Sequence, residues 1–178
     1  MRVRDALRAE GTVWWITGLS GAGKSTVSRL VRNGLSASGR PALLLDGDVI
    51  RDVLGETGAH DPEDRRRLAM TYGRLARELA GQGFDAVCAT ISMFHAVRAW
   101  NRDHIPSYRE IYLRVPLLEL ERRDSQGLYA RARDGEGGHV VGVDVPFEEP
   151  RCPDLVIDNF ACVDPAAAAA RILALKER

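Results

Sequence analysis

The sequence predicts an α/β fold in which helices cover both faces of a parallel β-sheet. Short apolar runs alternate along the chain with longer amphipathic stretches, a pattern that is typical of repeated strand–helix–strand units. Several of the short runs are apolar throughout, which indicates strands that are buried on both faces of the sheet. A glycine-rich segment also joins the first of these runs directly to an amphipathic stretch.

Each element has its own local signal. Residues 12–17 are β-branched and aromatic and run straight into glycine, which predicts the first strand. A helix is expected at 24–38, because Gly39 is a common helix terminator. A later helix is expected to begin at Asp61, which can cap it and is followed by Pro62. The other expected strands are 42–45, 84–91, 108–115 and 155–157, and the other expected helices are 96–103, 117–123 and an alanine-rich helix capped by Asp164.

The alternating pattern breaks at about residues 124–149, where glycines are scattered among charged residues. Long irregular segments inside compact domains often act as lids over a functional site. We therefore expect a lid at 124–149. The chain contains neither an internal repeat nor a change of composition that would mark a boundary, so residues 1–178 are expected to form a single domain.

Charge and composition exclude several classes of function. The chain has 25 basic and 25 acidic residues and a formal net charge of zero, whereas nucleic-acid-binding domains usually carry a clustered basic excess. No apolar run approaches the ~20 residues of a membrane span, and the N-terminus lacks the apolar core of a signal peptide. The three cysteines fit neither a zinc site nor a disulfide framework. We expect a cytoplasmic protein without a nucleic-acid or membrane partner.

The glycine-rich segment 18–25, Gly-Leu-Ser-Gly-Ala-Gly-Lys-Ser, matches the P-loop pattern G-x-x-x-x-G-K-[ST] in full. Its glycines let backbone N–H groups converge on phosphate oxygens, and the start of the following helix adds partial positive charge. Lys24 can reach the β- and γ-phosphates of ATP, and the Ser25 hydroxyl can ligate Mg²⁺. The residues expected to bind the nucleotide are Gly18, Ser20, Gly21, Ala22, Gly23, Lys24, Ser25 and Thr26.

Two carboxylates, Asp46 and Asp48, follow the second expected strand, and Arg51 comes one helical turn later. Ligands bind at this edge of parallel sheets. Asp46 can support Mg²⁺ and Asp48 can orient or deprotonate a substrate hydroxyl, while Arg51 can bind an anionic acceptor. The alternative is that either aspartate only caps the next helix.

These motifs, in this order, resemble the adenylylsulfate (APS) kinase family. The resemblance covers roughly residues 11 to 159. It implies a five-stranded sheet of order 2-3-1-4-5, transfer of phosphate from MgATP to the ribose 3′-hydroxyl of APS, and a homodimer. The motifs that carry it are Gly-Leu-Ser-Gly-Ala-Gly-Lys-Ser-Thr at 18–26, Leu-Asp-Gly-Asp-x-x-Arg at 45–51, Asp64–Arg65, Ile91–Ser92, Arg-Asp-x-x-Gly-Leu-Tyr-x-x-Ala-Arg at 123–133, and Gly-x-Asp-x-Pro-Phe-Glu-x-Pro at 142–150.

The resemblance also implies roles for individual residues. Asp48 would meet the 3′-hydroxyl, Arg51 would bind the acceptor phosphate, and Ser92 would lie at the phosphosulfate end. Further acceptor-side positions would be Arg65, Ile91, Met93, Phe94, His139 and Val140. Cations in or beside the lid that would act on the ATP side or on transition-state charge are Arg123, Arg131 and Arg133.

Departures from the family pattern concentrate on the acceptor side. The two phenylalanines that clamp the adenine of APS correspond to Ala59 and Val140, an acceptor-binding arginine to Met70, and a lid lysine to Gln126. Losing several contacts of about 1–3 kcal/mol each would weaken APS binding by orders of magnitude. We therefore predict a kinase that retains the donor site but takes a different acceptor.

A second resemblance concerns 91–102, where Ile-Ser-Met-Phe is followed by Ala-Trp-Asn-Arg. This segment is similar to an APS-kinase-like branch of surface-polysaccharide pathways, one type of which phosphorylates cytidine diphosphoramidate. Two other functions stay open: an ordinary APS kinase that makes PAPS in sulfate assimilation, and a regulatory protein that binds nucleotide without catalysis. Trp14 and Trp15 are expected in the core. Side chains left open between packing or exposure and an acceptor contact are His95, Arg98, Trp100, Asn101 and Arg102.

Overall fold

A computed structural model of the 178-residue chain describes residues 10–55, 62–124, 127–136, 140–160 and 163–177. Its strands form one five-stranded sheet, in which every neighbouring pair is parallel and the order is β2-β3-β1-β4-β5. The predicted α/β class and strand order are therefore confirmed. The strands are β1 (Val13–Thr17), β2 (Ala42–Asp46), β3 (Asp85–Thr90), β4 (Tyr108–Arg114) and β5 (Leu155–Asp158).

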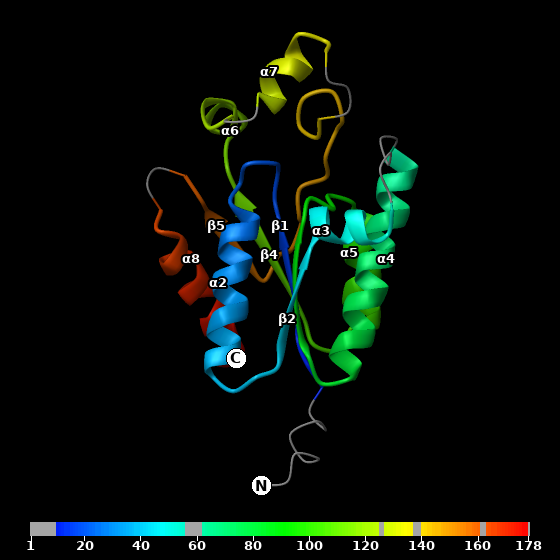
Figure 1. Cartoon of the computed structure of the whole chain (residues 1–178), viewed down its shortest axis with the longest axis vertical. Coiled ribbons are helices and arrows are strands. Elements are labelled where there is room, and N and C mark those ends of the chain that lie inside the picture. The colour runs from blue at the N-terminus through cyan, green and yellow to red at the C-terminus, as the bar shows by residue number, and fades with distance from the viewer. Residues whose placement is uncertain (1–9, 56–61, 125–126, 137–139, 161–162, 178) are drawn as a thin grey trace, which may run out of the picture.

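Helices cover both faces of this sheet, as Figure 1 shows. One face carries α2 (Lys24–Ala37) and α8 (Pro165–Leu173), and the other carries α4 (Pro62–Gly81) and α5 (His95–His104). The shorter helices are α3 (Gly47–Val53), α6 (Leu117–Arg122), α7 (Leu128–Arg133) and the 3₁₀ helix η1 (Ala174–Glu177).

The central strand β1 divides the hydrophobic core into two halves. Its residues are all buried, and they alternate between the two faces because successive side chains of a strand point in opposite directions. Trp14 and Ile16 pack in the half covered by α2 and α8. Val13 and Trp15 pack in the half covered by α4 and α5. The predicted core position of both tryptophans is confirmed.

The segment from 124 to 149 differs from the predicted irregular lid in one respect, because it contains the helix α7. The carboxylate of Asp124 accepts hydrogen bonds from the backbone N–H groups of Leu128 (2.7 Å), Tyr129 (2.7 Å) and Ala130 (3.1 Å). These bonds satisfy the unpaired donors of the first helical turn. The glycines of the segment therefore predicted irregular structure where Asp124 in fact stabilises the start of a short helix.

The carboxyl ends of all the strands lie at one edge of the sheet, because the strands are parallel. Figure 1 shows α3, α6 and α7 gathered at this end of the molecule. The start predicted for α4 at Asp61 lies outside the described residues. Across the described part of the chain, no helix combines the length and the apolar character that crossing a membrane requires.

Candidate active site

The loop between β1 and α2 can be built only with glycine at its critical positions. At Gly23 the backbone is left-handed, with φ of 87°, and a Cβ atom there would lie 2.8 Å from Asn159 Nδ2. At Gly18 a Cβ would lie 2.6 Å from the carbonyl oxygen of Leu113. No side chain caps the start of α2, and its first turn holds no acidic residue. The helix N-terminus is therefore open to an anion, which fits a nucleotide phosphate.

Asn159, directly after β5, supports this loop from behind and was missed at the level of sequence. Its side-chain Nδ2 donates a hydrogen bond of 2.8 Å to the carbonyl oxygen of Ala22. Its own carbonyl oxygen accepts a bond of 3.0 Å from Arg123 Nη1, and its N–H donates to Arg114 O at 2.9 Å. The residue is buried. One amide side chain thus fixes the glycine-rich loop relative to the end of the sheet.

Lys24 lies at the inner end of the loop. Its ammonium donates a hydrogen bond of 2.8 Å to the carbonyl oxygen of Leu19. The residue as a whole is partly exposed, but its ammonium group is surrounded by protein, and this burial lowers the pKa of Lys24 to about 8. The negative charges of Asp48 and Asp46 act in the opposite direction. An arriving phosphate would favour the charged form of the ammonium.

Asp46 and Asp48 stand at the start of α3, and the structure gives each a partner. Asp46 Oδ1 accepts a hydrogen bond of 3.1 Å from Asp48 N–H, so Asp46 is the N-cap of α3. The carboxylate of Asp48 pairs with the guanidinium of Arg51 one turn later and is largely exposed. The capping alternative therefore describes Asp46. Capping engages one carboxylate oxygen of Asp46, and the residue also lines the cavity described next.

A cavity of about 720 Å³ brings the loop and α3 together with the ends of β3 and the lid. On the acceptor side, Tyr72 lines it and donates a hydrogen bond of 2.9 Å to the carbonyl oxygen of Gly47. The sequence-predicted residues that line the cavity are Ser20, Gly21, Gly23, Lys24, Ser25, Thr26, Asp46, Asp48, Arg51, Arg65, Ile91, Ser92, Met93, Phe94 and Val140.

The part of the cavity lined by α3, α4 and the residues after β3 carries both charge and a buried hydroxyl group. Ser92 is buried, and its Oγ has no hydrogen-bond partner within the described part of the chain. Burial lowers the pKa of Arg65, and the neighbouring charge of Arg51 lowers it further, whereas Asp144 of the lid opposes the shift. Two guanidinium groups therefore face the same space, where they favour an anionic ligand.

The lid arginines do not line this cavity in the structure. Arg123 donates to Glu119 Oε1 at 2.8 Å and to the Asn159 carbonyl. Arg133 forms an ion pair with Glu121, and Arg131 lies beside it in α7. Gly18 and Ala22 belong to the loop without lining the cavity. His139, Ala59 and Gln126 lie outside the described residues.

Three residues of α5 that the sequence leaves open between packing and an acceptor contact are held by neighbours outside the cavity lining. Trp100 stacks on His104 with ring centroids 4.5 Å apart, and Arg77 of α4 lies 5.6 Å from the centroid of the Trp100 ring. Asn101 is fully buried next to Gly73. Arg102 pairs with Glu110 at 2.9 Å. Since none of these side chains lines the cavity, the structure supports the packing alternative for Trp100, Asn101 and Arg102.

Comparisons with known proteins identify the family of the chain. The family model described as adenylylsulphate kinase matches residues 10–158. The chain is 42% identical over 152 residues to the adenylyl-sulfate kinase of Paraburkholderia xenovorans, with 85% of each chain covered. It is 39% identical over 145 residues to the cytidine diphosphoramidate kinase of Campylobacter jejuni, which covers 82% of this chain and 84% of that protein.

Solved structures lead to the same family. The APS kinase CysC of Mycobacterium tuberculosis, in complex with AMPPNP and APS, superposes with a TM-score of 0.87 and 35% sequence identity, covering 95% of this chain and 99% of that one. The chain therefore belongs to the adenylylsulphate kinase family.

Proposed function

We propose that the protein transfers the γ-phosphoryl group of ATP to a hydroxyl group, the ribose 3′-hydroxyl, of a small nucleotide-type acceptor. One observation carries the proposal: a single cavity is lined by Lys24 and Ser25 of the phosphate-binding loop and by Asp48 and Arg51 of α3. In-line phosphoryl transfer needs a donor phosphate and an acceptor oxygen in one enclosed space.

The loop side suits ATP. The uncapped N-terminus of α2 and the ammonium of Lys24 would hold the β- and γ-phosphates. Ser25 and Asp46 would hold Mg²⁺, Ser25 through its hydroxyl and Asp46 through the oxygen that does not cap α3. When bound, Mg²⁺ neutralises charge that builds up between these phosphates. The complex of CysC with AMPPNP supports this reading, because AMPPNP is an analogue of ATP.

The α3 side suits a hydroxyl acceptor. Asp48 is exposed to the cavity and can accept a hydrogen bond from the attacking hydroxyl and then its proton. Arg51, which pairs with Asp48, can turn to an anionic group of the acceptor without leaving the cavity. The carboxylate of Asp48 is then no longer paired with Arg51 when it accepts the proton.

The lid supports an acceptor other than APS. The described lid residues that line the cavity are aliphatic or proline, namely Leu128, Val140, Val141, Val145 and Pro146. An aromatic clamp on a purine base would need a ring on this face. The likeness to the cytidine diphosphoramidate kinase of Campylobacter jejuni supports a cytidine nucleotide of that kind as the first candidate. The likeness to the adenylyl-sulfate kinase of Paraburkholderia xenovorans supports APS as the second.

A coupled assay of ADP release separates the candidates. Cytidine diphosphoramidate and APS are offered in turn with MgATP, and ³¹P NMR of the product locates the new phosphate. Faster turnover of the cytidine nucleotide supports the first candidate, whereas efficient turnover of APS at micromolar concentration replaces it with the second. If the protein binds ATP but none of the acceptor nucleotides stimulates the release of ADP, a regulatory protein is favoured. Homodimerisation remains a prediction that sedimentation velocity can test.

A further inference from the structure

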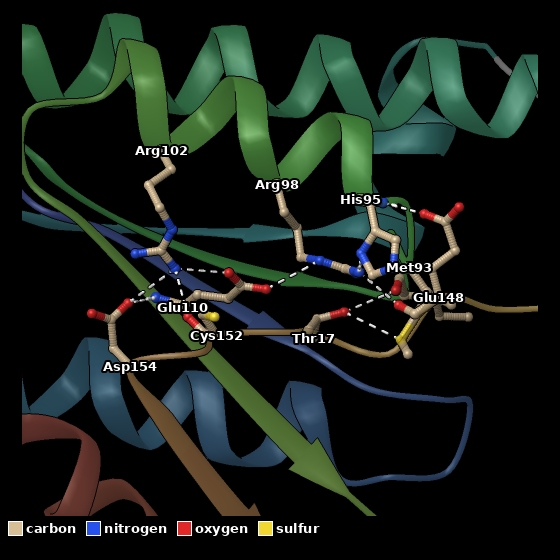
Figure 2. A network of polar contacts seen from close by, with 10 residues as sticks. Thr17, Met93, His95, Arg98, Arg102, Glu110, Glu148, Cys152 and Asp154 are labelled. Atoms are coloured by element: carbon tan, nitrogen blue, oxygen red, sulfur yellow. Dashed lines mark hydrogen bonds and ion pairs between the residues drawn. The ribbon is translucent and has the colours of Figure 1, made fainter.

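A buried arginine of α5, Arg98, lies at the centre of a polar network behind the cavity (Figure 2). Only 4% of Arg98 is exposed, and its partner Glu110 on β4 is 3% exposed. Arg98 Nε lies 3.2 Å from Glu110 Oε1. Burial lowers the pKa of Arg98, and the charge of Glu110 is the largest influence in the opposite direction. A charge this deeply buried needs a partner, and Glu110 supplies it.

The other end of the same guanidinium reaches the lid. Arg98 Nη2 donates a hydrogen bond of 2.6 Å to the carbonyl oxygen of Glu148 and lies 2.8 Å from His95 Nδ1. Glu148 belongs to the segment 146–149, which we call the lid stem because it leads from the lid back to the sheet. Figure 2 shows Arg98 between Glu110 on one side and His95 and Glu148 on the other.

The lid stem in turn holds the loop that lines the acceptor side of the cavity. The N–H of Glu148 donates a hydrogen bond of 3.1 Å to the carbonyl oxygen of Met93. The carboxylate of Glu148 accepts a hydrogen bond from the N–H of His95. Met93 and Pro146 both line the cavity, one from each side of this junction. Arg98 itself does not touch the cavity, so it acts through these neighbours.

We propose that Arg98 is a positioning residue for the acceptor site, because it joins the lid stem to His95, which begins α5 directly after the loop 91–94, and so sets the distance between the lid and the end of β3. The inference rests on the proposed function, in which this side of the cavity binds the acceptor. The planar guanidinium keeps its Nε in ion-pair contact with Glu110 while its Nη2 donates to the carbonyl oxygen of Glu148. A lysine can satisfy Glu110 but cannot bridge the two partners at fixed geometry.

Arg102 provides a matched control. It lies one turn further along α5 and pairs with the same carboxylate, with Nη2 2.9 Å from Glu110 Oε2. Its other contacts go to Asp154, at 3.6 Å, and to the carbonyl oxygen of Cys152. It therefore shares the Glu110 partner of Arg98 but, among the described residues, forms neither a hydrogen bond nor an ion pair with the lid stem or with residues 91–95.

The experiment compares Arg98→Lys with Arg102→Lys, using the acceptor that the wild-type enzyme turns over, cytidine diphosphoramidate or APS. We expect Arg98→Lys to raise the KM for that acceptor roughly tenfold, because one charge-assisted hydrogen bond is lost. The KM for ATP should change less than about twofold. Arg102→Lys should leave both KM values within about twofold of wild type. An equal shift of both KM values in Arg98→Lys, or no shift in the acceptor KM, would overturn the proposal.

A double variant separates positioning from neutralisation of a buried charge. Arg98→Met with Glu110→Met removes both members of the pair and leaves Arg102 with Asp154 as its partner, so the melting temperature should be closer to wild type than in Arg98→Met alone. If Arg98 positions the lid stem, the acceptor KM stays raised in this variant. If the acceptor KM returns to the wild-type value, Arg98 only neutralises Glu110 and the proposal fails.

Hydrogen exchange tests the same inference without any acceptor. In Arg98→Lys the amides of His95 and Glu148 should exchange faster than in wild type, whereas in Arg102→Lys they should not. Unchanged exchange at both amides would overturn the positioning role whatever the kinetics show. If no acceptor is turned over but exchange quickens as expected, the proposed function fails and the positioning of the stem by Arg98 stands.

Discussion

The hydroxyl of Tyr129 donates a hydrogen bond of 2.8 Å to the carbonyl oxygen of Ser20, so the lid helix α7 is attached directly to the phosphate-binding loop. The ring of Tyr129 is buried in the core half that α2 and α8 cover. The other end of the lid is attached through Glu148 to the acceptor-side loop. Tyr129 therefore attaches α7 to the donor side of the cavity, and Glu148 attaches the lid stem to the acceptor side.

Replacing Tyr129 with phenylalanine should loosen the donor-side attachment while the ring stays in the core. We expect a loss of stability of about 1 kcal/mol and a rise in ADP release without acceptor, because a looser lid admits water to the site. Thermal unfolding and the coupled assay measure these effects. Tyr108→Phe on β4, which does not line the cavity, is the control, and equal uncoupled ADP release in the two variants would contradict the role of Tyr129.

Replacing Asp48 with asparagine removes the proposed proton acceptor and keeps the size of the side chain. We expect kcat to fall at least about 100-fold, while ATP affinity changes little because Asp48 lies on the acceptor side. Isothermal titration with ATP and single-turnover kinetics measure the two quantities. Asp52→Asn, an exposed change on the same helix, should be silent. Near-normal turnover by Asp48→Asn would remove this residue from the mechanism.

Replacing Asn159 with alanine deletes the support behind the phosphate-binding loop. The carbonyl oxygen of Ala22 loses its bond to Nδ2, so we expect the KM for ATP to rise several-fold, as for the loss of one hydrogen bond. The acceptor KM should stay unchanged. Asn33→Ala, on the exposed side of α2, controls for loss of an amide side chain. An unchanged KM for ATP would show that the loop keeps its shape without Asn159.

The pH dependence of ATP binding should report on Lys24. In the free protein burial lowers its pKa to about 8, so the ammonium is charged below that pH and becomes neutral above it. ATP phosphates favour the charged form, so binding should take up protons at about pH 8 to 9 and weaken as the pH rises through that range. Titrations in buffers of different ionisation enthalpy measure the proton uptake. Lys24→Met should abolish it, and identical uptake in that variant would assign the protons elsewhere.

Replacing Val140 with phenylalanine puts an aromatic ring on the lid face of the cavity. If the missing ring excludes APS, this change should raise kcat/KM for APS relative to cytidine diphosphoramidate roughly tenfold, as for one stacked base. Val143→Phe, in the lid but outside the cavity lining, is the control. The acceptor argument would be falsified if a stably folded Val140→Phe variant kept the wild-type ratio.

The sequence by itself determined the sheet and the donor loop. The order of strands and helices along the chain follows from the period of its apolar residues. The loop is a contiguous sequence motif, in which a strand-to-helix turn of this kind leaves no room for a Cβ atom at Gly18 and Gly23. Asp46 and Asp48 were found for the same reason, because the end of a parallel strand marks the ligand edge of the sheet. Such signals are local, so they survive without knowledge of the fold. A local signal for α7 was also present, an aspartate before a run of good helix formers, but the surrounding glycines obscured it.

Only the tertiary structure decided which residues support the site. Asn159 meets Ala22 across 137 positions of sequence, Tyr129 meets Ser20 across 109, and Arg98 meets Glu148 across 50. The tertiary structure was also needed to show that Trp100 packs between α5 and α4 and does not line the cavity. A hydrogen bond depends on the distance and direction between two groups in space, and no pattern within a short stretch of sequence contains either. Local periodicity therefore fixes which faces are buried, and the packed fold fixes which distant groups meet.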